Sequence, residues 1–345
     1  MWRYLTAGES HGKAEISILE GCPANLTISE DEINKELARR QAGYGRGERM
    51  KIEADKAEIL SGVRNGKTIG SPISISIINK STEFFDKAIT QIRPGHADLP
   101  GALKYNQSDI RNILERASAR ETASRVALGA IAKMLLREFK ISINSRVLDI
   151  GGKTSEADQK KAIDQAKKDG DTVGGVFEVT ATGLPPGLGS HVQWDRRLTG
   201  MLAQAIFSIP AIKGVEFGQG FEVALLPGSK VHDALSYKAG QGFTRQTNNA
   251  GGLEGGMTNG EPLVLRAAVK PIATMIKPLD SVDLASKKPA KALVERSDIC
   301  AVEPAAVIGE AVVALTLAGA MVEKFGGDNL ADMLAAIKHY KTRIS

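Results

Sequence analysis

Runs in which polar and apolar residues alternate mark the strands of this chain. The alternation is clearest at 13–20 and 69–78, where Ile and polar residues exchange along the run. Because alternate residues of a strand line one face of its sheet, this pattern favours antiparallel sheets with one buried face. Further strands are predicted at 59–63, 141–150, 176–182, 214–226 and 262–270. Asn65-Gly66 lies between two of the runs and predicts a hairpin turn.

Helices are predicted where apolar residues recur every three or four positions. Ser29 and Glu32 form a capping box that starts a helix reaching about Arg40. A long helix is expected within 110–139, and others at 198–207, 304–325 and 328–340. The most apolar stretch, 311–322, is well short of the about 20 residues that a bilayer core requires. We therefore predict a buried core helix there and no membrane span.

Two segments repeat one order of elements. GKAEISILEGCP at 12–23 and GGVFEVTATGLP at 174–185 each run from glycine through a strand to Gly-x-Pro, a loop and a helix. This echo predicts a duplicated α+β unit. No low-complexity linker separates the halves and strands do not alternate regularly with helices, so we expect one α+β domain over residues 1–345 and no doubly wound parallel sheet.

Composition narrows the function classes. Hydrophobic residues make up 42% of the 345 residues and charged residues 25%, as in soluble globular proteins. Lys and Arg number 45 against 40 Asp and Glu, and a net charge of +5 is weak evidence for nucleic-acid binding. A basic nucleic-acid-binding protein is the main alternative class. Such a protein needs aromatic residues on which bases stack, and these make up only 5% of the chain.

Cysteine and histidine usage excludes further classes. Cys22 and Cys300 are the two cysteines, too few for a disulfide scaffold, and no histidine spacing typical of a metal site occurs. The first twelve residues show no signal-peptide pattern, so a cytoplasmic protein is expected. The run 62–68 resembles a P-loop, but it has three residues between its glycines and lies between two strands.

Arginines and glycines gather in segments that suit an anionic ligand. Four arginines occur within 39–49, interleaved with Gly43, Gly45 and Gly47. Guanidinium groups bind phosphate and carboxylate in a bidentate fork, although a solvated basic loop at a helix end is an equal alternative. Arg116 and Arg120 are four residues apart and are expected on one helical face, where surface salt bridges with Glu115 and Glu121 are the alternative.

Histidines in turns supply candidate proton donors. His11 lies between glycines before a strand, and His96 lies in the turn RPGHAD. Each can exchange a proton near neutral pH, although lone histidines are more often structural. The glycine-rich loop 248–260, the run 270–274 and Asp298 add polar groups. Together these residues predict a site for a small polyanion carrying phosphate and carboxylates.

Several longer sequence runs match those of a known protein family. GESHG, LEGCP, ERASARETASRV and RSDICAVEPA occur in order, with ARRQAGYGRG, RPGHAD, AGGLEGGMTNG and KPIAT between them. In these runs the chain resembles the chorismate synthase family. The resemblance implies a helical core sandwiched between antiparallel β-sheets with internal pseudo-duplication, assembled as a homotetramer. It also implies a carbon–oxygen lyase that converts 5-enolpyruvylshikimate 3-phosphate to chorismate and phosphate in a 1,4-elimination.

Reduced FMN is required in the family although no net redox change occurs. No reductase domain is visible, so an external flavin reductant is expected, with NADPH as a candidate source of electrons. The resemblance implies catalytic roles for His11 on the departing phosphate, His96 beside the flavin and Asp298 in proton removal. It implies no metal.

The same resemblance assigns binding residues. The substrate residues are Ser10, Arg39, Arg46, Arg49 and Arg120. The flavin residues are Arg116, Ala117, Ser118, Pro210, Ala211, Gly255, Lys270, Pro271, Ile272, Ala273, Thr274 and Arg296. Arg40 and Arg46 are linked to a nicotinamide nucleotide. Pro210 departs from a polar residue in the family, so its contact is expected through the backbone carbonyl.

Overall fold

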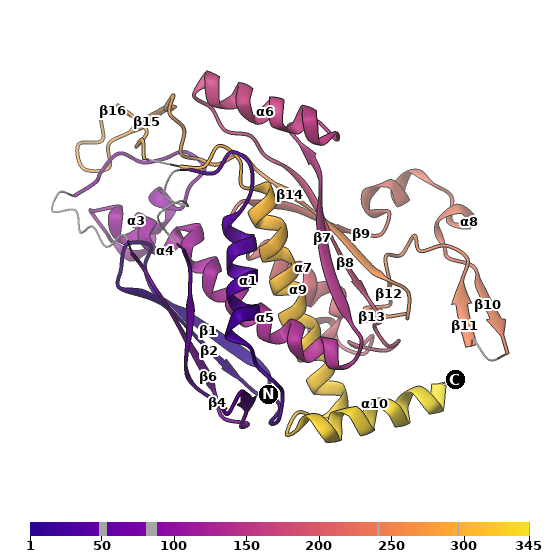
Figure 1. Ribbon diagram of the computed structural model, residues 1–345. Coiled ribbons are helices and arrows are strands. Elements are labelled where there is room, and N and C mark those ends of the chain that lie inside the picture. The colour runs from indigo at the N-terminus through magenta and orange to yellow at the C-terminus, as the bar shows by residue number, and fades with distance from the viewer. Residues whose placement is uncertain (48–53, 81–87, 240–241, 296, 345) are drawn as a thin grey trace.

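Two four-stranded antiparallel sheets form the outer layers of the protein (Figure 1). The computed structural model describes residues 1–47, 54–80, 88–239, 242–295 and 297–344. The first sheet has the order β1-β2-β6-β3, from β1 (Arg3–Ala7), β2 (Ala14–Glu20), β3 (Ala57–Ser61) and β6 (Ile73–Ile78). The second has the order β7-β8-β14-β9, from β7 (Ser142–Ile150), β8 (Gly175–Thr182), β9 (Ile212–Phe217) and β14 (Leu263–Val269).

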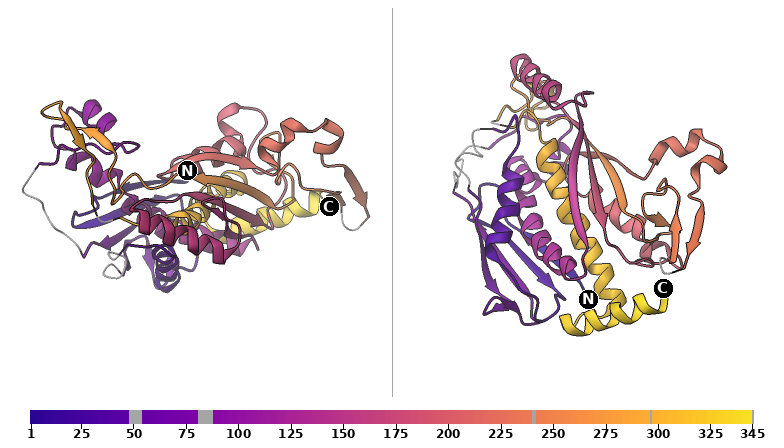
Figure 2. Two further views of the ribbon diagram at one scale, coloured as in Figure 1. Left: turned by 90° about the horizontal axis from the view of Figure 1, so that it is seen from above. Right: turned by 45° about the vertical axis from the view of Figure 1, so that its right-hand side comes forward.

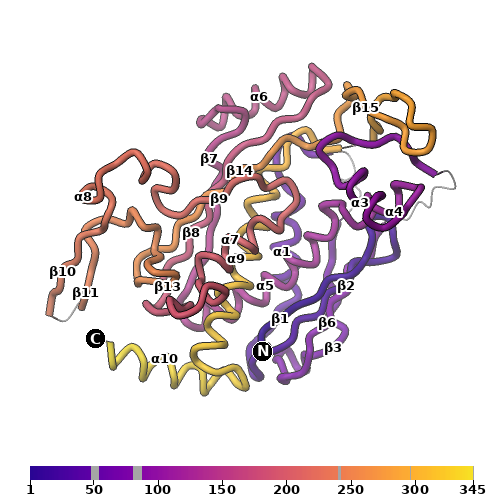
Figure 3. Tube along the Cα trace, turned by 180° about the vertical axis from the view of Figure 1, so that it is seen from behind, coloured from indigo at the N-terminus to yellow at the C-terminus, as the bar shows by residue number. Residues whose placement is uncertain are grey.

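The two sheets share one topology, which confirms the predicted duplication. In each, the first two strands of the chain pair, a helix follows, and the last strand inserts between the second and the third. The helices α1 (Glu30–Gln41), α5 (Thr122–Glu138), α7 (Leu198–Phe207) and α9 (Val302–Phe325) lie between the sheets (Figures 2 and 3). The predicted α+β fold with a sandwiched helical core is therefore confirmed.

Close helix packing at the centre depends on a glycine. A Cβ built on Gly129 of α5 would lie 2.4 Å from Cβ of Ala311 on α9, so this glycine lets the two helices touch. On the sheets, alternation buries Ile73, Ile75 and Ile77 of β6 completely. One apolar core therefore includes residues from both sheets and from the helices between them.

The long helix expected within 110–139 is present as α5, but the apolar repeat before it belongs to a separate short helix. The chain forms α4 (Arg111–Ala117), takes an extended conformation at Ser118 (φ −66°, ψ 144°), and continues through the 3₁₀ turn η1 (Ala119–Glu121) into α5. The hydroxyl of Ser118 accepts a hydrogen bond from the backbone N–H of Arg120. This local cap competes with a continuous helix and starts a new one.

The hairpin turn predicted at Asn65-Gly66 is confirmed. Asn65 and Gly66 have φ of 50° and 72° and join β4 (Val63–Arg64) to β5 (Lys67–Thr68), as a type I′ turn requires. The strand expected at 214–226 ends instead at Phe217, and the short helix η3 (Gly220–Leu225) follows. A Cβ on Gly218, whose φ is +57°, would meet the backbone oxygen of Asn249, so glycine is needed where the chain leaves the sheet.

Helix α9 is long and apolar enough to cross a membrane by length and composition alone. Its most apolar window is 83% buried inside the described structure, which identifies it as a core helix. Pro304 lies in its first turn, where the missing N–H costs nothing.

Smaller elements extend from the sandwich. A lobe of α3 (Asp98–Tyr105), α4, β15 (Asp280–Val282) and β16 (Pro289–Lys291) has its own apolar cluster around Ile110. At the other end an arm is formed by η3, α8 (Gly228–Val231), β10 (Leu235–Lys238) and β11 (Gly242–Arg245) (Figure 1). The described residues also form α6 (Glu156–Asp169), η2 (Trp194–Arg196), β12 (Leu253–Glu254), β13 (Met257–Thr258) and α10 (Leu330–Ile344).

Candidate active site

Two arginines of the segment 39–49 and Arg120 converge around two carboxylates. Arg40 Nη1 lies 3.5 Å from Asp55 Oδ2, and Arg120 Nη1 lies 2.5 Å from Asp55 Oδ1. Arg46 Nη1 lies 2.7 Å from Asp298 Oδ2. Burial lowers the pKa of Arg40 to about 10; Asp55 opposes this shift, while the Arg120 and Arg46 cations add to it. Arg40 is thus a buried cation beside two others, and an anionic ligand here would offset the burial that lowers its pKa.

The burial of these groups strengthens that conclusion. Nε of Arg46 and Nη1 of Arg40 are buried, and neither donates a hydrogen bond within the described part of the chain. Buried donors without acceptors carry a free-energy cost, which an oxygen-rich ligand would remove. The cluster thus fits the phosphate or carboxylate predicted from the sequence.

The serine between Arg116 and Arg120 decides where each side chain goes. Arg120 is buried and donates from Nε to Asn79 Oδ1 at 2.8 Å. Arg116, whose side chain is 42% exposed, turns back to the β1 end, where it donates to Thr6 O and Gly8 O. The expectation that both arginines share one helical face was therefore wrong, because Ser118 breaks the helix between them.

His11 is held in the turn between β1 and β2. Its Nδ1 lies 2.9 Å from Glu115 Oε1, and its backbone N–H donates to Glu115 Oε2 at 2.8 Å. Burial would raise the pKa of Glu115, but hydrogen bonds from His11 and Arg111 outweigh it and lower the pKa. Since this carboxylate binds Nδ1, the imidazole would exchange a proton with a ligand through Nε2.

The other residues of the predicted turn site are close to His11. The backbone N–H of Ser10 donates to Glu115 O at 3.0 Å, and the Ser10 and Ser118 hydroxyls are 3.1 Å apart. The turn GESHG and the break at Ser118 are thus in direct contact, as one shared site requires.

His96 is held by a second buried carboxylate. Its Nδ1 lies 2.5 Å from Oδ1 of Asp98, which is completely buried and also binds Arg93. Burial opposes ionisation of Asp98, but the His96 and Arg93 hydrogen bonds hold its pKa well below the ordinary value. Arg93 also donates to Thr274 Oγ1 at 3.0 Å. The turn RPGHAD and the run 270–274 therefore meet.

An ion-pair chain connects the two histidine sites. Arg93 Nη1 is 3.7 Å and Arg111 Nη1 is 3.2 Å from Glu295, and Arg111 is 3.4 Å from Glu115. Sequence reasoning did not assign roles to these residues, although Arg93 and Glu115 lie within motifs that it singled out. Asp55 and Asn79 gave no signal, because they stand in segments without a recognised pattern.

The predicted flavin segments are partly assembled. Lys270 Nζ donates to Gly95 O at 3.0 Å, and the Lys270 N–H donates to Ala211 O at 2.9 Å, so 210–211 lies beside 270–274. Burial and the neighbouring Lys213 lower the pKa of Lys270. Gly255 lies apart, in the β12–β13 turn near His191. Arg49 and Arg296 are outside the described residues.

Arg39 does not join the converging arginines. Its guanidinium forms two 2.8 Å hydrogen bonds with Glu310 of α9 and contacts Glu36. The hydrogen bond with Glu310 raises its pKa. Lys133 and Ser145 also contact Glu310, each at 2.5 Å. Arg39, a predicted substrate residue, is therefore already paired with carboxylates of the protein.

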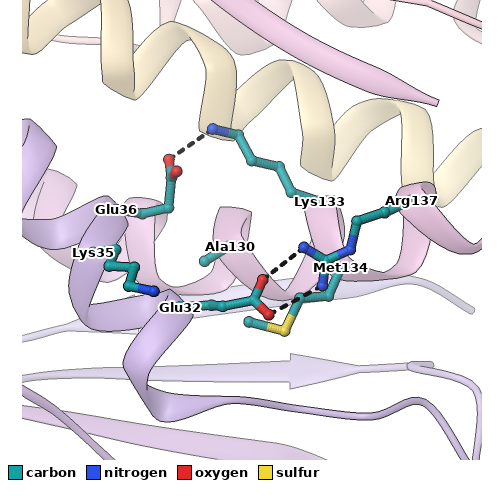
Figure 4. Close-up of a pocket in the computed structure, with 7 residues that line it drawn as sticks. All are labelled: Glu32, Lys35, Glu36, Ala130, Lys133, Met134 and Arg137. Carbon is teal, nitrogen blue, oxygen red and sulfur yellow. Dashed lines mark hydrogen bonds and ion pairs between the residues drawn. The ribbon is translucent and has the colours of Figure 1, made fainter. Parts of the chain in front are cut away.

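Two hollows in the described structure lie outside the histidine sites. One, of about 160 Å³, lies between α1 and α5 and contains Glu32, Lys35, Glu36, Ala130, Lys133, Met134 and Arg137 (Figure 4). There Lys133 pairs with Glu36 and Arg137 pairs with Glu32, so two of its three cations already have carboxylate partners. The other, of about 380 Å³, lies between Tyr44 and α6. No group of acidic, histidine or cysteine residues in the described ranges could hold a metal ion.

Comparisons with known proteins agree with this geometry. The family model for chorismate synthase matches residues 2–322. A chorismate synthase of Caldanaerobacter subterraneus subsp. tengcongensis is 59% identical over 96% of both chains, and one of Moorella thermoacetica is 54% identical over 100% of both. A crystal structure of a chorismate synthase has a TM-score of 0.84 at 45% identity, covering 99% of this chain and 98% of the other. The chain therefore belongs to the chorismate synthase family of carbon–oxygen lyases.

Proposed function

We propose that this enzyme eliminates phosphate from 5-enolpyruvylshikimate 3-phosphate to give chorismate, with reduced FMN bound beside the substrate. The supporting observation is the cluster of Arg40, Arg46 and Arg120, in which Nη1 of Arg40 and Nε of Arg46 are buried and donate to no acceptor among the described residues. The substrate carries a phosphate and two carboxylates, which match guanidinium forks in charge and shape. Arg46 and Arg120 are its proposed anchors, with Ser10 and Arg49 as predicted contacts. Arg39 is the least suitable predicted contact, because Glu310 and Glu36 already bind it.

His11 is the proposed acid for the departing phosphate. Glu115 binds Nδ1 of its imidazole at 2.9 Å, which fixes the ring, so Nε2 is the nitrogen that would exchange a proton with the substrate. Glu115 is itself held by Arg111 at 3.4 Å. A proton delivered from Nε2 would neutralise charge as the carbon–oxygen bond breaks.

The residues around His96 fit a flavin. Lys270 has no carboxylate partner among the described residues, and Arg93 joins His96 to Thr274. With Arg116–Ser118 and 210–211 these groups would hold FMN, with Arg296 and Gly255 as further predicted contacts. Reduced FMN, when bound, supplies the electron density that expulsion of phosphate from an unactivated carbon requires. His96 would hold the proton beside the cofactor.

Asp298 is the proposed assistant in removal of the C6 proton. Its carboxylate accepts a hydrogen bond from Gly47 N at 2.6 Å and pairs with Arg46 at 2.7 Å. It therefore also positions the loop that carries Arg46, a role that its sequence pattern did not indicate.

The remaining assignments concern the setting of the reaction. We propose a cytoplasmic homotetramer that obtains reduced flavin from an external reductant. NADPH is a candidate source of electrons, with Arg40 and Arg46 as predicted contacts. Arg40 is 5% exposed, so Arg46 offers the more accessible of the two guanidinium groups.

An anaerobic assay tests the proposal. The purified protein is incubated with substrate and dithionite-reduced FMN, and chorismate and phosphate are measured together. We expect equal amounts of both products, and none with oxidised FMN. Turnover without flavin would instead support a phosphate-releasing enzyme that needs no cofactor, and a flavin-bound protein that releases no product would contradict the proposal.

A further inference from the structure

A buried carboxylate without a strong partner lies beneath the His11 turn. Glu15 of β2 is 1% exposed, and its Oε2 accepts no hydrogen bond in the described part of the chain. The nearest cation is Arg116, whose Nη1 is 3.8 Å from Oε2, beyond hydrogen-bond distance. A buried carboxylate is normally paired or hydrogen-bonded, so this arrangement calls for a physical explanation.

The position of Glu15 relates it to the candidate site. A Cβ built on Gly8 would lie 2.7 Å from Glu15 Oε2, so the carboxyl group packs directly against the start of the turn that carries Ser10 and His11. Arg116 donates to Gly8 O at 3.1 Å, to Thr6 O at 2.9 Å and to Thr6 Oγ1 at 2.8 Å. These acceptors are neutral, so Glu15 is the carboxylate that pairs with Arg116.

The charges around Glu15 leave its ionisation finely balanced. Burial is the largest influence and raises its pKa to about 7, against the lowering effect of Arg120 and Arg116 and with the raising effect of Glu121 and Glu9. Two of these neighbours have partners of their own, since Arg120 pairs with Asp55 and Glu121 pairs with Arg125. Arg120 lowers the pKa of Glu15 more than Arg116 does, but Arg116 is the cation that lies within ion-pair distance of Glu15 in the described part of the chain.

We propose that Glu15 takes up a proton when the phosphate of FMN binds at Arg116, so that this carboxyl group couples cofactor affinity to pH. The inference rests on the proposed function, in which Arg116 is a flavin residue. An ionised Glu15 competes with the incoming phosphate for the Arg116 cation, whereas a protonated Glu15 does not. The proton comes from solvent, and no bond other than its own O–H forms.

The sign of the effect follows from linkage. A bound anion near Glu15 disfavours its charged form and raises the proton affinity of the complex above that of the free protein. Affinity for FMN is then highest below the pKa of free Glu15 and falls as pH rises through it. One coupled proton sets a limit of about tenfold in affinity per pH unit.

The experiment compares the wild type with Glu15→Gln, which imitates the protonated acid at every pH. Oxidised FMN is titrated at pH 6 to 8.5 by quenching of its fluorescence. The phosphate of FMN titrates equally with both proteins, so the ratio of the two dissociation constants isolates Glu15. We expect the ratio near one at pH 6, and Glu15→Gln binding about three- to tenfold more tightly at pH 8.5. Glu20→Gln, on the same strand but at the surface, is the matched control and should follow the wild type.

A second measurement needs no variant. Calorimetric titration of the wild type with FMN in two buffers of different ionisation enthalpy gives the protons taken up, and riboflavin, which lacks the phosphate, gives the reference. We expect greater proton uptake with FMN than with riboflavin at pH 7.5. Equal uptake for the two flavins, or wild-type and Glu15→Gln curves that stay parallel, would overturn the inference. Absence of saturable FMN binding at every pH would count against the proposed function itself.

Discussion

At the scale of single residues, His11 is the group whose role is easiest to separate from folding. Its side chain is partly exposed, and its removal leaves Glu115 paired with Arg111. We expect His11→Ala to lower turnover about 100-fold or more, as loss of a general acid does, with little change in the thermal midpoint or in FMN affinity. Anaerobic turnover, thermal unfolding and flavin titration measure the three quantities.

The histidine control lies far from this turn. His339 is on the exposed face of α10, so His339→Ala should keep the full rate and the same stability. A His11→Ala protein that retains the wild-type rate would remove His11 from the mechanism. A thermal midpoint that falls to the assay temperature would instead show that the rate is lost through unfolding, and would indicate a structural role.

Arg39 and Arg40 show what a residue pattern can and cannot predict. The sequence identified a basic cluster for an anion, and the structure does bring Arg40 to Arg46 and Arg120. Neighbouring residues on a helix point about 100° apart, so both arginines cannot face one site. Which of them turns away is decided by Glu310, 271 residues later in the chain, and no local pattern contains that information.

At the scale of elements, the break at Ser118 is the main departure from the predicted helices. The apolar repeat continues on both sides of it, so periodicity alone favours one helix. The serine cap is a local alternative of similar free energy, and contact of its hydroxyl with Ser10 stabilises the break. Because of the break, Arg116 contacts the end of β1, whereas Arg120 pairs with Asp55.

Helix α9 carries a buried charge that fixes the active-site end of α1. Hydrogen bonds from Arg39, Lys133 and Ser145 outweigh burial and lower the pKa of Glu310 to about 2. Because the pKa in the folded state is below that of an unfolded Glu, about 4.3, the network stabilises the fold above pH 4 and less as pH falls. We expect Glu310→Gln to lower the free energy of unfolding by about 3 kcal/mol at pH 7, measured with urea.

The pH dependence and an exposed pair test this interpretation. The difference between wild type and Glu310→Gln should shrink as the pH approaches 3, since Glu310 of the unfolded chain takes up a proton below about pH 4.3 while the folded carboxylate stays ionised. Glu32, paired with Arg137 at the surface, is the matched control, and Glu32→Gln should change stability by less than about 1 kcal/mol. Equal losses for the two variants would show that the buried network adds no more than a surface pair.

At the scale of the whole molecule, the two sheets and the helices between them could be predicted from the sequence, whereas the arm of η3, α8, β10 and β11 could not. The repeated strand–Gly-x-Pro–helix order identified the duplication, because both halves must bury the same kind of sheet face against the helices. The arm was missed, since apolar residues continue past Phe217 and suggest a longer strand. Burial explains the difference: the alternation of buried and exposed side chains that marks the two large sheets has no counterpart in 220–239 and 242–245, where many apolar side chains face solvent.

That arm is the strongest indication of assembly. Phe221 and Phe243 are 82% and 73% exposed, and Leu225, Leu235 and Tyr237 are also exposed. A monomer rarely leaves so many large apolar side chains exposed together, so we expect them to be covered in the proposed homotetramer.

Substituting both Phe221 and Phe243 by Ser should give a smaller species in light scattering after size exclusion, with unchanged circular dichroism. Leu60→Ser, at an exposed position of β3 in the first sheet, is the control and should leave the assembly intact. A double variant that remains tetrameric would place the interface elsewhere, and a monomeric wild type at micromolar concentration would contradict the assembly itself.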